Sequence, residues 1–306
     1  MTSAQQVSEF ESLRPHLMSV AYRITGTVAD AEDIVQDAWL RLHRQDSDKA
    51  TQISDLRAWL TTVVGRLGLD RLRSAAHRRE TYTGNWLPEP VVTGLSNSPA
   101  ADPLSAVVAG EDARFAAMVV LERLSPDQRV AFVLHDGFAV PFAEVARVLG
   151  TNEATARQLG SRARKAVAAD PPPEPDPAHH EVVSKLLAAM ASGDLDAVVG
   201  LLHPDVTLTG DANGKAPTAI NVIHGADKVA RFFFGLAQRY GPAMFTAYQL
   251  GLVNGELGGY TPGCPARDGY REMMPRIMAA TVRDGKVCAL WDVANPDKFT
   301  GSPLRG

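Results

Sequence analysis

The sequence predicts a multidomain protein in which helical domains precede a mixed α+β domain. Apolar residues recur at three- and four-residue steps through most of residues 10–168, which is the period of amphipathic helices. Residues 170–177 contain five prolines, a composition typical of a semi-rigid polyproline II spacer. After this spacer, β-branched and aromatic runs follow helical segments, and Asp284-Gly285 between two such runs is a strong hairpin signal.

Composition limits the class of protein. The chain has 306 residues, enough for two or three domains, and its 45% hydrophobic and 22% charged content is ordinary for a globular protein. It has no apolar run of about 18 residues and no basic-then-apolar N-terminal segment, so we expect a cytoplasmic protein without membrane contact. The only cysteines, Cys264 and Cys288, are too few and too far apart for a zinc ribbon or a redox motif. We expect no metal site and no cofactor.

Three helices are predicted before residue 80, over residues 10–25, 29–44 and 55–79. The second carries acidic residues in its first turn, where the helix dipole favours anions. Trp39 on this helix either contacts a partner or half-covers a small helical core. The inward positions of the helix are apolar, which leaves an outward polar face with Asp33, Gln36, Asp37 and Arg41.

Arginines crowd the end of the third helix. The net charge of −4 argues against a uniformly basic DNA-coating protein, but it allows a local basic patch. Cations are favourable near a helix C-terminus, which accounts for two or three of these arginines. The others, with Trp59 and His77, fit a nucleic-acid surface, where aromatic rings stack on bases and guanidinium groups bind phosphates. The arginines are Arg66, Arg71, Arg73, Arg78 and Arg79.

Residues 141–168 predict a helix-turn-helix with a basic second helix. Phe142 begins a helical repeat of apolar residues, Gly150 breaks it, and Asn152 can cap a helix that starts near Glu153. Small and apolar residues share one face of the second helix, so its basic and polar residues point outward, as contacts with phosphates and base edges require. The alternative is an ordinary helical hairpin with a solvated basic face.

Helical periodicity fails between residues 80 and 109, where Gly, Ser, Asn and Pro indicate an extended linker. Trp86 and Leu87 are unusual in a solvated linker. We expect residues 86–90, WLPEP, to dock onto another surface, because burying the Trp would contribute on the order of 2–3 kcal/mol. Helices are expected next at residues 111–124 and 128–135.

The part beyond residue 178 changes character. Helices followed by a mostly antiparallel curved sheet indicate an α+β domain with one concave face. Asn254-Gly255 is a second possible hairpin turn. The expected helices are 181–192, 194–202 and 226–240, and the expected strands are 206–209, 219–223, 245–253, 277–283 and 286–293.

Three helical segments together resemble a known family. They are RPHLMSVAYRITGTVADAEDIVQDAWLRLHR, LRAWLTTVVGRLGLDRLRSAAHRRE and LSPDQRVAFVLHDGFAVPFAEVARVLGTNEATARQLGSRARKAVA, and they are similar to regions two and four of bacterial sigma factors of the extracytoplasmic-function (ECF) group. The remainder, with HEVVSKLLAAMASGDLDAVVGLLHPDVTLTGD, resembles a SnoaL-like (NTF2-like) fold. A subclass that joins the two carries a WLPEP linker, a DGGGK-like loop and a terminal NPDK motif. Here these are residues 86–90, 211–215 (DANGK) and 295–298.

The resemblance implies two all-α sigma domains, a region-two helical bundle and a region-four helix-turn-helix, followed by an α+β NTF2/SnoaL-like cone. It implies region two at residues 1–80, the WLPEP linker at 81–109, region four at 110–169, the Pro-rich linker at 170–178 and the SnoaL-like regulatory domain at 179–306.

The resemblance also implies a function, which is to direct core RNA polymerase to promoters. The partners would be the β′ clamp helices and β flap of the polymerase, together with promoter DNA. The 29–44 helix would contact the clamp helices through Asp33, Gln36, Asp37 and Arg41. The 55–79 helix would recognise the minus-10 element through Trp59, Arg66, Asp70, Arg71 and Arg73. The second helix of the helix-turn-helix would read the minus-35 element with Glu153, Thr155, Arg157, Gln158, Arg162, Arg164 and Lys165.

The resemblance further implies regulation in cis by the C-terminal domain, in place of a separate anti-sigma factor. We expect Trp86, Leu87, Pro88, Glu89 and Pro90 to dock near Asp211, Lys215, Asn295, Pro296, Asp297 and Lys298. This docking would set the spacing of the two DNA-reading domains. Ala212 and Asn213 replace glycines of the family loop, so a positive φ is easily kept only at Asn213 and Gly214.

Other functions stay open. A small-molecule effector would fit a concave domain of this kind. Catalysis in the cone would need an acid or base, but no pair of candidates stands at a fixed spacing, so we expect no enzyme. A dimeric helix-turn-helix repressor is another alternative, but it would give residues 29–79 no function. The residues available for catalysis are His203, Asp205, His224, Tyr248 and Asp292.

Overall fold

The computed structural model describes residues 3–44, 53–79, 81–95 and 103–305. The chain forms two compact units. Unit 1 comprises Met1–Thr81, Pro103–Ala113 and Ala117–Pro172, and unit 2 comprises Tyr82–Asp102, Arg114–Ala116 and Pro173–Gly306. The described residues 82–95, which follow the first three helices, therefore fold with the C-terminal part of the chain.

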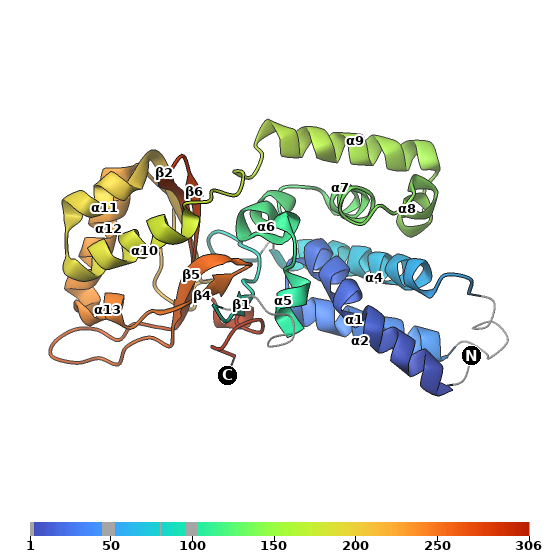
Figure 1. The fold of residues 1–306 in the computed structure, drawn as a ribbon, viewed down its shortest axis with the longest axis horizontal. Coiled ribbons are helices and arrows are strands. Elements are labelled where there is room, and N and C mark those ends of the chain that lie inside the picture. Colours follow the sequence, from blue (N-terminus) through green and yellow to red (C-terminus); the bar gives the residue numbers. More distant parts are fainter. Residues whose placement is uncertain (1–2, 45–52, 80, 96–102, 306) are drawn as a thin grey trace. The chain divides into compact units, whose positions relative to one another are not determined.

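Unit 1 begins with three packed helices, α1 (Ser3–Thr25), α2 (Val28–His43) and α4 (Leu56–Arg79), drawn in blue in Figure 1. Their apolar stripes meet, since Leu17 and Ile24 of α1 are fully buried, as the helical periodicity predicted. Thr27 starts α2, and its hydroxyl accepts a hydrogen bond from the Asp30 backbone N–H (3.3 Å).

The second half of unit 1 contains the helix-turn-helix. Helix α8 (Phe142–Leu149) ends at Gly150, whose φ of 66° is left-handed, and α9 (Glu153–Ala169) starts after Asn152, which accepts a hydrogen bond from the Thr155 N–H (2.8 Å). Helix α9 contacts α7 and α8, and these two contact α4 (Figure 1). The other elements are α5 (Pro103–Val107), η1 (Glu111–Ala113), α6 (Phe115–Leu121), α7 (Pro126–Phe132) and the π-helical η2 (Val133–Gly137).

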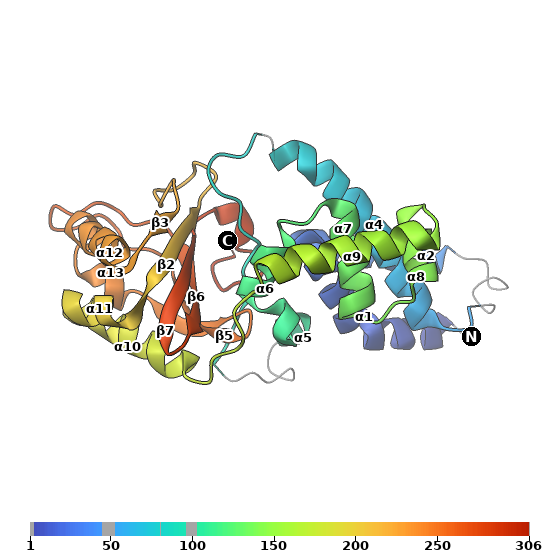
Figure 2. The ribbon, with the colours of Figure 1, turned by 90° about the horizontal axis from the view of Figure 1, so that it is seen from above.

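Unit 2 is a sheet in the order β1-β4-β5-β6-β7-β2-β3, with helices against one face (Figure 2). All neighbouring strands pair antiparallel except β2 and β7, which are parallel. The strands are β1 (Val92–Thr93), β2 (Leu202–Asp211), β3 (Ile223–His224), β4 (Gln249–Val253), β5 (Glu256–Thr261), β6 (Arg276–Arg283) and β7 (Lys286–Val293). The helices are α10 (His179–Ser192), α11 (Leu195–Leu201), α12 (Ala226–Tyr240), α13 (Ala243–Thr246) and η3 (Pro296–Lys298). Figure 2 also shows that α10, α11 and α12 lie on the same side of the sheet.

Both predicted hairpin turns are present in unit 2. Asp284 and Gly285 have φ of 54° and 68°, and Asn254 and Gly255 have φ of 50° and 86°. Positive φ at both central residues matches the right-handed twist of the flanking strands, which is why these dipeptides are favoured there.

Several expected elements differ from the observed ones. The linker at 81–109 is not wholly extended, because it contains helix α5, and its residues 92–93 form strand β1. The expected helix at 111–124 is divided into η1 and α6, and the 245–253 strand starts as α13. The 219–223 strand is reduced to β3, and β5 was not expected because its two glycines weaken the strand pattern.

Candidate functional site

Helix α9 exposes the basic residues that the sequence placed on its outward face. Its inner face is buried at Ala156 and Ala163, which fixes the rotation of the helix. Arg157 lies over the Phe142 ring, with 5.0 Å from its guanidinium carbon to the ring centre. Arg164 donates to Asp136 (Nη1–Oδ1 3.0 Å). The exposed residues are Glu153, Arg157, Gln158, Arg162, Arg164 and Lys165, and Thr155 is half-buried.

Helix α4 is the second place where basic residues gather. Arg71 contacts Asp30 (Nε–Oδ1 3.3 Å) and Asp33 (Nη2–Oδ2 2.9 Å) of α2. Arg73 contacts Asp127 at the start of α7 (Nη2–Oδ1 2.9 Å). Part of the positive charge of this helix is therefore matched within unit 1. Arg66, Asp70 and Arg73 are exposed and Trp59 and Arg71 are half-buried, while the side chains of His77, Arg78 and Arg79 lie outside the described part of the structure.

Helix α2 presents its predicted polar face. Trp39 is half-buried, and its ring centre lies 4.9 Å from that of Phe10 and 5.7 Å from that of His43. These contacts fit a ring that covers the edge of the small helical core. The exposed residues are Asp33, Gln36, Asp37 and Arg41.

A buried carboxylate binds the linker to unit 2. Asp211, at the end of β2, is 0% exposed and accepts hydrogen bonds from the Tyr82 hydroxyl and from the Leu87 backbone N–H (2.7 Å). The Lys298 ammonium lies 2.6 Å from Asp211 Oδ2 and also donates to the Leu87 carbonyl. It is 3.5 Å from the centre of the Trp86 ring, a cation–π contact. We call Tyr82, Trp86, Leu87, Asp211 and Lys298 the linker clamp.

Residues 88–93 continue along unit 2. The buried Glu89 carboxylate accepts from the Gly301 N–H (2.8 Å), and the Val92 N–H donates to the Gly301 carbonyl (2.8 Å). Asn254 makes two hydrogen bonds with Val91. Its side-chain oxygen accepts from the Val91 N–H (3.0 Å), and its own N–H donates to the Val91 carbonyl (2.8 Å). Strand β1 then pairs with β4, Val92 opposite Val253. Leu87, Pro88, Glu89 and Pro90 are all buried, and Trp86 is half-buried.

The DANGK loop and the NPDK segment meet the same linker. The Asn213 side chain accepts from the Thr83 N–H (3.1 Å), and the Asn295 side chain donates to the Tyr82 hydroxyl (2.9 Å). Asn213 and Gly214 have φ of 47° and 69°, as the loop sequence predicted. Pro296 opens η3, and the exposed Lys215 and Asp297 form an ion pair. Burial, and then the hydrogen bond to Asp211, raise the pKa of Tyr82, so its hydroxyl remains a donor.

Comparison with known proteins decides the family. Models of sigma-70 region 2 and sigma-70 region 4 match residues 10–78 and 114–167. The ECF RNA polymerase sigma factor SigJ of Mycobacterium tuberculosis is 76% identical over 303 residues, which cover 98% of this chain and 95% of that protein. The crystal structure of M. tuberculosis SigJ is similar with a TM-score of 0.85 and 72% identity, covering 98% of this chain and 100% of that one. The ECF RNA polymerase sigma factor SigG of M. tuberculosis is 30% identical over 274 residues, 80% of this chain and 70% of that protein.

The chain belongs to the ECF sigma factors.

As an ECF sigma factor, the chain recognises promoters and supports initiation of transcription by RNA polymerase. The region-2 match covers most of α1, all of α2 and nearly all of α4, and the region-4 match runs from α6 into α9. The predicted fold of helical sigma domains followed by an α+β NTF2-like domain is confirmed.

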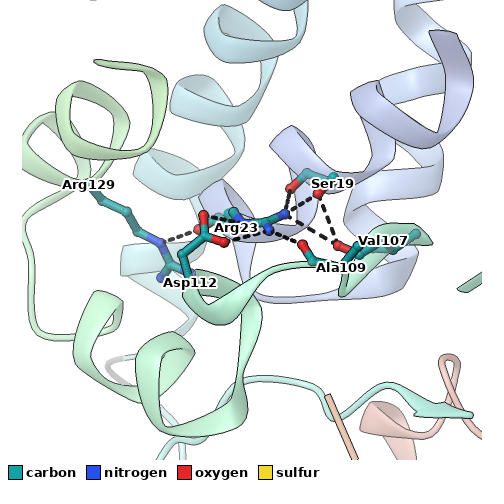
Figure 3. A network of polar contacts seen from close by, with 6 residues as sticks. All are labelled: Ser19, Arg23, Val107, Ala109, Asp112 and Arg129. Atoms are coloured by element: carbon teal, nitrogen blue, oxygen red, sulfur yellow. Dashed lines mark hydrogen bonds and ion pairs between the residues drawn. The ribbon is translucent and has the colours of Figure 1, made fainter. Parts of the chain in front are cut away.

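Buried arginines join the two sigma regions within unit 1 (Figure 3). Arg23 of α1 donates from Nε and Nη2 to the two oxygens of Asp112 in η1 (2.8 Å each), and from Nη2 to the Ala109 carbonyl (2.8 Å). Arg129 of α7 donates from Nε to the Arg23 carbonyl (2.9 Å), which α1 itself leaves without a helical partner, and from Nη1 to Glu122 (2.6 Å). Arg23 and Arg129 are only 4% and 1% exposed, whereas the Asp112 carboxylate that Arg23 binds is 49% exposed.

His16 of α1 lies beside this network. Its Nε2 is 2.9 Å from Thr61 Oγ1, and its Nδ1 is 3.1 Å from Arg57 Nη2. Thr61 donates its hydrogen to the Arg57 carbonyl (2.8 Å) and Arg57 can only donate, so we assign the ring proton to Nε2. The ring stands edge-on to Phe138, with 5.2 Å between centres. Burial, and then the charges of Arg57 and Arg23, lower the pKa of His16 to about 4.

The residues considered for catalysis are distributed over unit 2. His203 Nδ1 and Asp205 Oδ2 lie 4.0 Å apart in β2, and His224 of β3 pairs with Thr207 of β2. Tyr248 lines an apolar cavity, and burial raises its pKa. The Asp292 carboxylate accepts hydrogen bonds from Arg276 and Thr218.

The described residues contain neither a membrane-spanning helix nor a metal-binding cluster of side chains. None of their helices is both long and apolar enough to cross a bilayer. Within the same described ranges, no three His, Cys, Asp or Glu side chains are grouped as a metal ion would require.

Sequence reasoning missed several residues of these networks, among them Tyr82, Arg23, Arg129 and His16. Tyr82 had an available signal, because a second aromatic residue stands close before the docking Trp86. The two arginines had no such signal in the sequence, because a charged residue in a helix is normally exposed to solvent. Only the residues around it in the fold show that it is buried.

Proposed function

We propose that this sigma factor works in the cytoplasm through three exposed surfaces that bind core polymerase and promoter DNA. Helix α2 offers Asp33, Gln36, Asp37 and Arg41 to the β′ clamp helices, and region four contacts the β flap. Helix α4 recognises the minus-10 element with Trp59, Arg66, Asp70, Arg71 and Arg73. Helix α9 enters the major groove at the minus-35 element, where its exposed basic face suits base edges and phosphates. The residues on α9 are Glu153, Thr155, Arg157, Gln158, Arg162, Arg164 and Lys165.

In unit 1 the helix assigned to the minus-10 element lies close to the helix assigned to the minus-35 element, which supports regulation of promoter binding. The two promoter elements lie about 25 base pairs apart, or roughly 85 Å along B-DNA. Helix α4 contacts α7 and α8, which both contact α9, so α4 and α9 lie within two helix-packing distances, roughly 20 Å. A Cβ at Gly65 of α4 would stand 2.9 Å from a Leu134 methyl, so the absent side chain permits this close contact. On this proposal the two regions separate when both elements are bound.

The linker clamp is the observation that carries the proposal. Residues 82–102 connect the two regions, and a free segment of this length spans roughly 70 Å when fully extended. With residues 82–93 bound to unit 2, these residues no longer contribute to that span. The C-terminal unit thereby limits how far the two regions can separate. The residues proposed for this regulation are Trp86, Leu87, Pro88, Glu89, Pro90, Asp211, Lys215, Asn295, Pro296, Asp297 and Lys298.

Run-off transcription with purified core polymerase tests the proposal. Templates should carry one promoter, selected in vitro for dependence on this protein, with the distance between its elements varied base pair by base pair. The full chain should give a narrow optimum of spacing. Deletion from Asn295 onward, or Trp86→Ala, should broaden or shift that optimum, because the linker is no longer held.

The matched control is Arg231→Ala, which removes an exposed ion pair with Asp227 on α12 and should leave the spacing profile unchanged. Identical profiles for the full chain, the deletion and Trp86→Ala would refute regulation through the clamp. A failure to initiate specifically with core polymerase would instead refute the sigma role and favour a repressor.

A second proposal concerns the cone of unit 2. A small-molecule effector binds in its apolar cavity, and the C-terminal unit carries out no reaction of its own. The supporting observation is the apolar cavity between α10, α12, α13 and the sheet. Mass spectrometry of molecules retained by the natively purified chain tests whether an effector is present.

A further inference from the structure

The turn between β4 and β5 holds the linker. Asn254 exchanges two hydrogen bonds with Val91, one through its side-chain oxygen (3.0 Å) and one through its backbone N–H (2.8 Å). Asn254 is 1% exposed, and both Asn254 and Gly255 have a positive φ, so the turn has a defined shape. The linker is therefore attached to unit 2 at one fixed point.

The same turn holds the start of region four. Glu256 follows Gly255 and opens β5, and its Oε1 lies 3.4 Å from Nη1 of Arg114. Arg114 is the first residue of the region-four match and belongs to unit 2. The two side chains are 10% and 13% exposed, and Glu256 Oε2 is buried without a hydrogen-bond partner in the described part of the chain. This carboxylate therefore depends on Arg114 to balance its charge.

Phe115 adds an apolar contact to this attachment. It is 1% exposed, and its ring centre lies 5.4 Å from that of Trp291 in β7. Successive side chains of a strand point to opposite faces. Leu290 and Leu257 both belong to the core between the sheet and its helices, so Trp291 and Glu256 point to the other face. Region four thus begins on the face of the sheet opposite α10, α11 and α12.

The chain also leaves region four at this place. Arg114 Nη2 donates to the Pro173 carbonyl (2.9 Å). Further along, Asp176 accepts from the Gly285 N–H (3.0 Å), so the second half of the Pro-rich segment is bound to unit 2. Residues 170–172 remain between α9 and Pro173, a tether of roughly 10 Å. One guanidinium group therefore joins the entry and the exit of region four.

We infer that Arg114 is a positioning residue for promoter recognition, because it holds both ends of region four at the turn that also holds the linker. Asn254 and Glu256 are two residues apart, at most about 7 Å between their Cα atoms. Residues 92–113 then form a loop that is closed at its base. The length of this loop does not set the distance between the two DNA-reading regions, because the β4–β5 turn sets it.

This inference rests on the proposed control of promoter spacing by the C-terminal unit. It names the residue through which that control reaches region four. The linker clamp attaches the end of region two, and Arg114 attaches region four, so both regions are held by the same unit.

Lengthening the closed loop tests the inference directly. About six Gly and Ser residues inserted after Gly94 add roughly 20 Å of reach and alter none of the contacts above. Run-off transcription on the templates of varied spacing should give the profile of the parent chain. The same insertion after Thr81 lies before the linker clamp and lengthens the connection of region two to unit 2. It should broaden the profile, raising transcript about two base pairs from the optimum at least about fivefold relative to the optimum.

Substitution of Arg114 tests the attachment itself. Arg114→Met should broaden the profile and make it sensitive to the insertion after Gly94. Arg114→Lys keeps a cation beside Glu256 but lacks the planar fork that serves two acceptors, so it should broaden the profile less. It preserves the charge pair if Arg114→Met does not fold, which circular dichroism shows. Arg283→Met, an exposed change at the end of β6, is the control.

The shape of the profile separates positioning from stability, since a variant that is only less stable loses transcript equally at all spacings. Such a uniform loss in both Arg114 variants overturns the inference. So does an insertion after Gly94 that broadens the parent profile as much as the insertion after Thr81. Trp86→Ala is measured on the same templates. If it changes the profile and the Arg114 variants do not, this inference alone fails, whereas an unchanged profile for Trp86→Ala and for the deletion from Asn295 refutes the proposed function.

Discussion

Lys298 and Asp211 form an ion pair inside the C-terminal unit, 2.6 Å between Nζ and Oδ2, with 3% and 0% of the two residues exposed. A buried pair of this kind adds little net stability, because desolvation of both charges offsets their attraction. The same carboxylate accepts from Tyr82 and Leu87, so Asp211 joins the linker to Lys298 of η3.

Lys298→Met should destabilise the chain strongly. It leaves the Asp211 charge buried without a cation, a change that costs about 3–5 kcal/mol of unfolding free energy. Urea unfolding followed by fluorescence measures it. Lys215→Met is the control, because the pair of Lys215 with Asp297 is exposed and contributes at most about 1 kcal/mol. Adding Asp211→Asn to Lys298→Met should restore part of the loss. Equal losses for Lys298→Met and Lys215→Met would contradict the clamp geometry.

Arg129→Met should destabilise unit 1. The change leaves the Arg23 carbonyl and the Glu122 carboxylate without their buried donor, which costs about 3 kcal/mol. Arg73→Met removes only the exposed contact with Asp127 and should cost less than about 1 kcal/mol. The thermal unfolding of both variants, compared with the parent, gives the ranking, and the reverse order would contradict the network in Figure 3.

Arg162→Ala should weaken promoter binding. If this exposed residue of α9 reads a base, its loss costs about 1–3 kcal/mol and relaxes specificity at one position of the minus-35 element. Fluorescence anisotropy of the holoenzyme on labelled promoter DNA measures the affinity, with Arg231→Ala on α12 as the control. Unchanged affinity and unchanged transcription from a dependent promoter would remove Arg162 from the interface.

Stability should fall on acidification because of His16. Its pKa is about 4 in the folded chain and near 6.5 when unfolded, so between these values the unfolded chain binds more protons. The contribution of His16 to the free energy of unfolding is therefore fully present above about pH 7. It is lost as the pH falls to about 4, which lowers the free energy of unfolding by on the order of 3 kcal/mol. His16→Gln, whose amide can donate to Thr61 and accept from Arg57, should flatten this part of the profile. An equally steep profile in that variant would assign the effect to other groups.

Local signals in the sequence determined most of the helical architecture. The three- and four-residue repeat located α1, α2 and α4, and Gly150 with Asn152 located the turn between α8 and α9, because backbone conformation and capping depend on residues close in sequence. The same is true of Asp284-Gly285 and of the positive φ at Asn213 and Gly214. Trp86 in a Pro-rich segment indicated that the linker would dock, because an exposed Trp gains by burial.

Tertiary structure alone decided where the linker docks and what holds it. Strand β1 exists because Val92 meets Val253, and no local pattern contains a pairing over so long a separation. The burial of Asp211 depends on partners from two distant parts of the chain, Tyr82 and Leu87 of the linker and Lys298 of η3. A lone aspartate predicts solvent exposure; only its assembled donors make the buried charge stable. The sequence thus determined the helices and the docking segment, and the fold decided their partners.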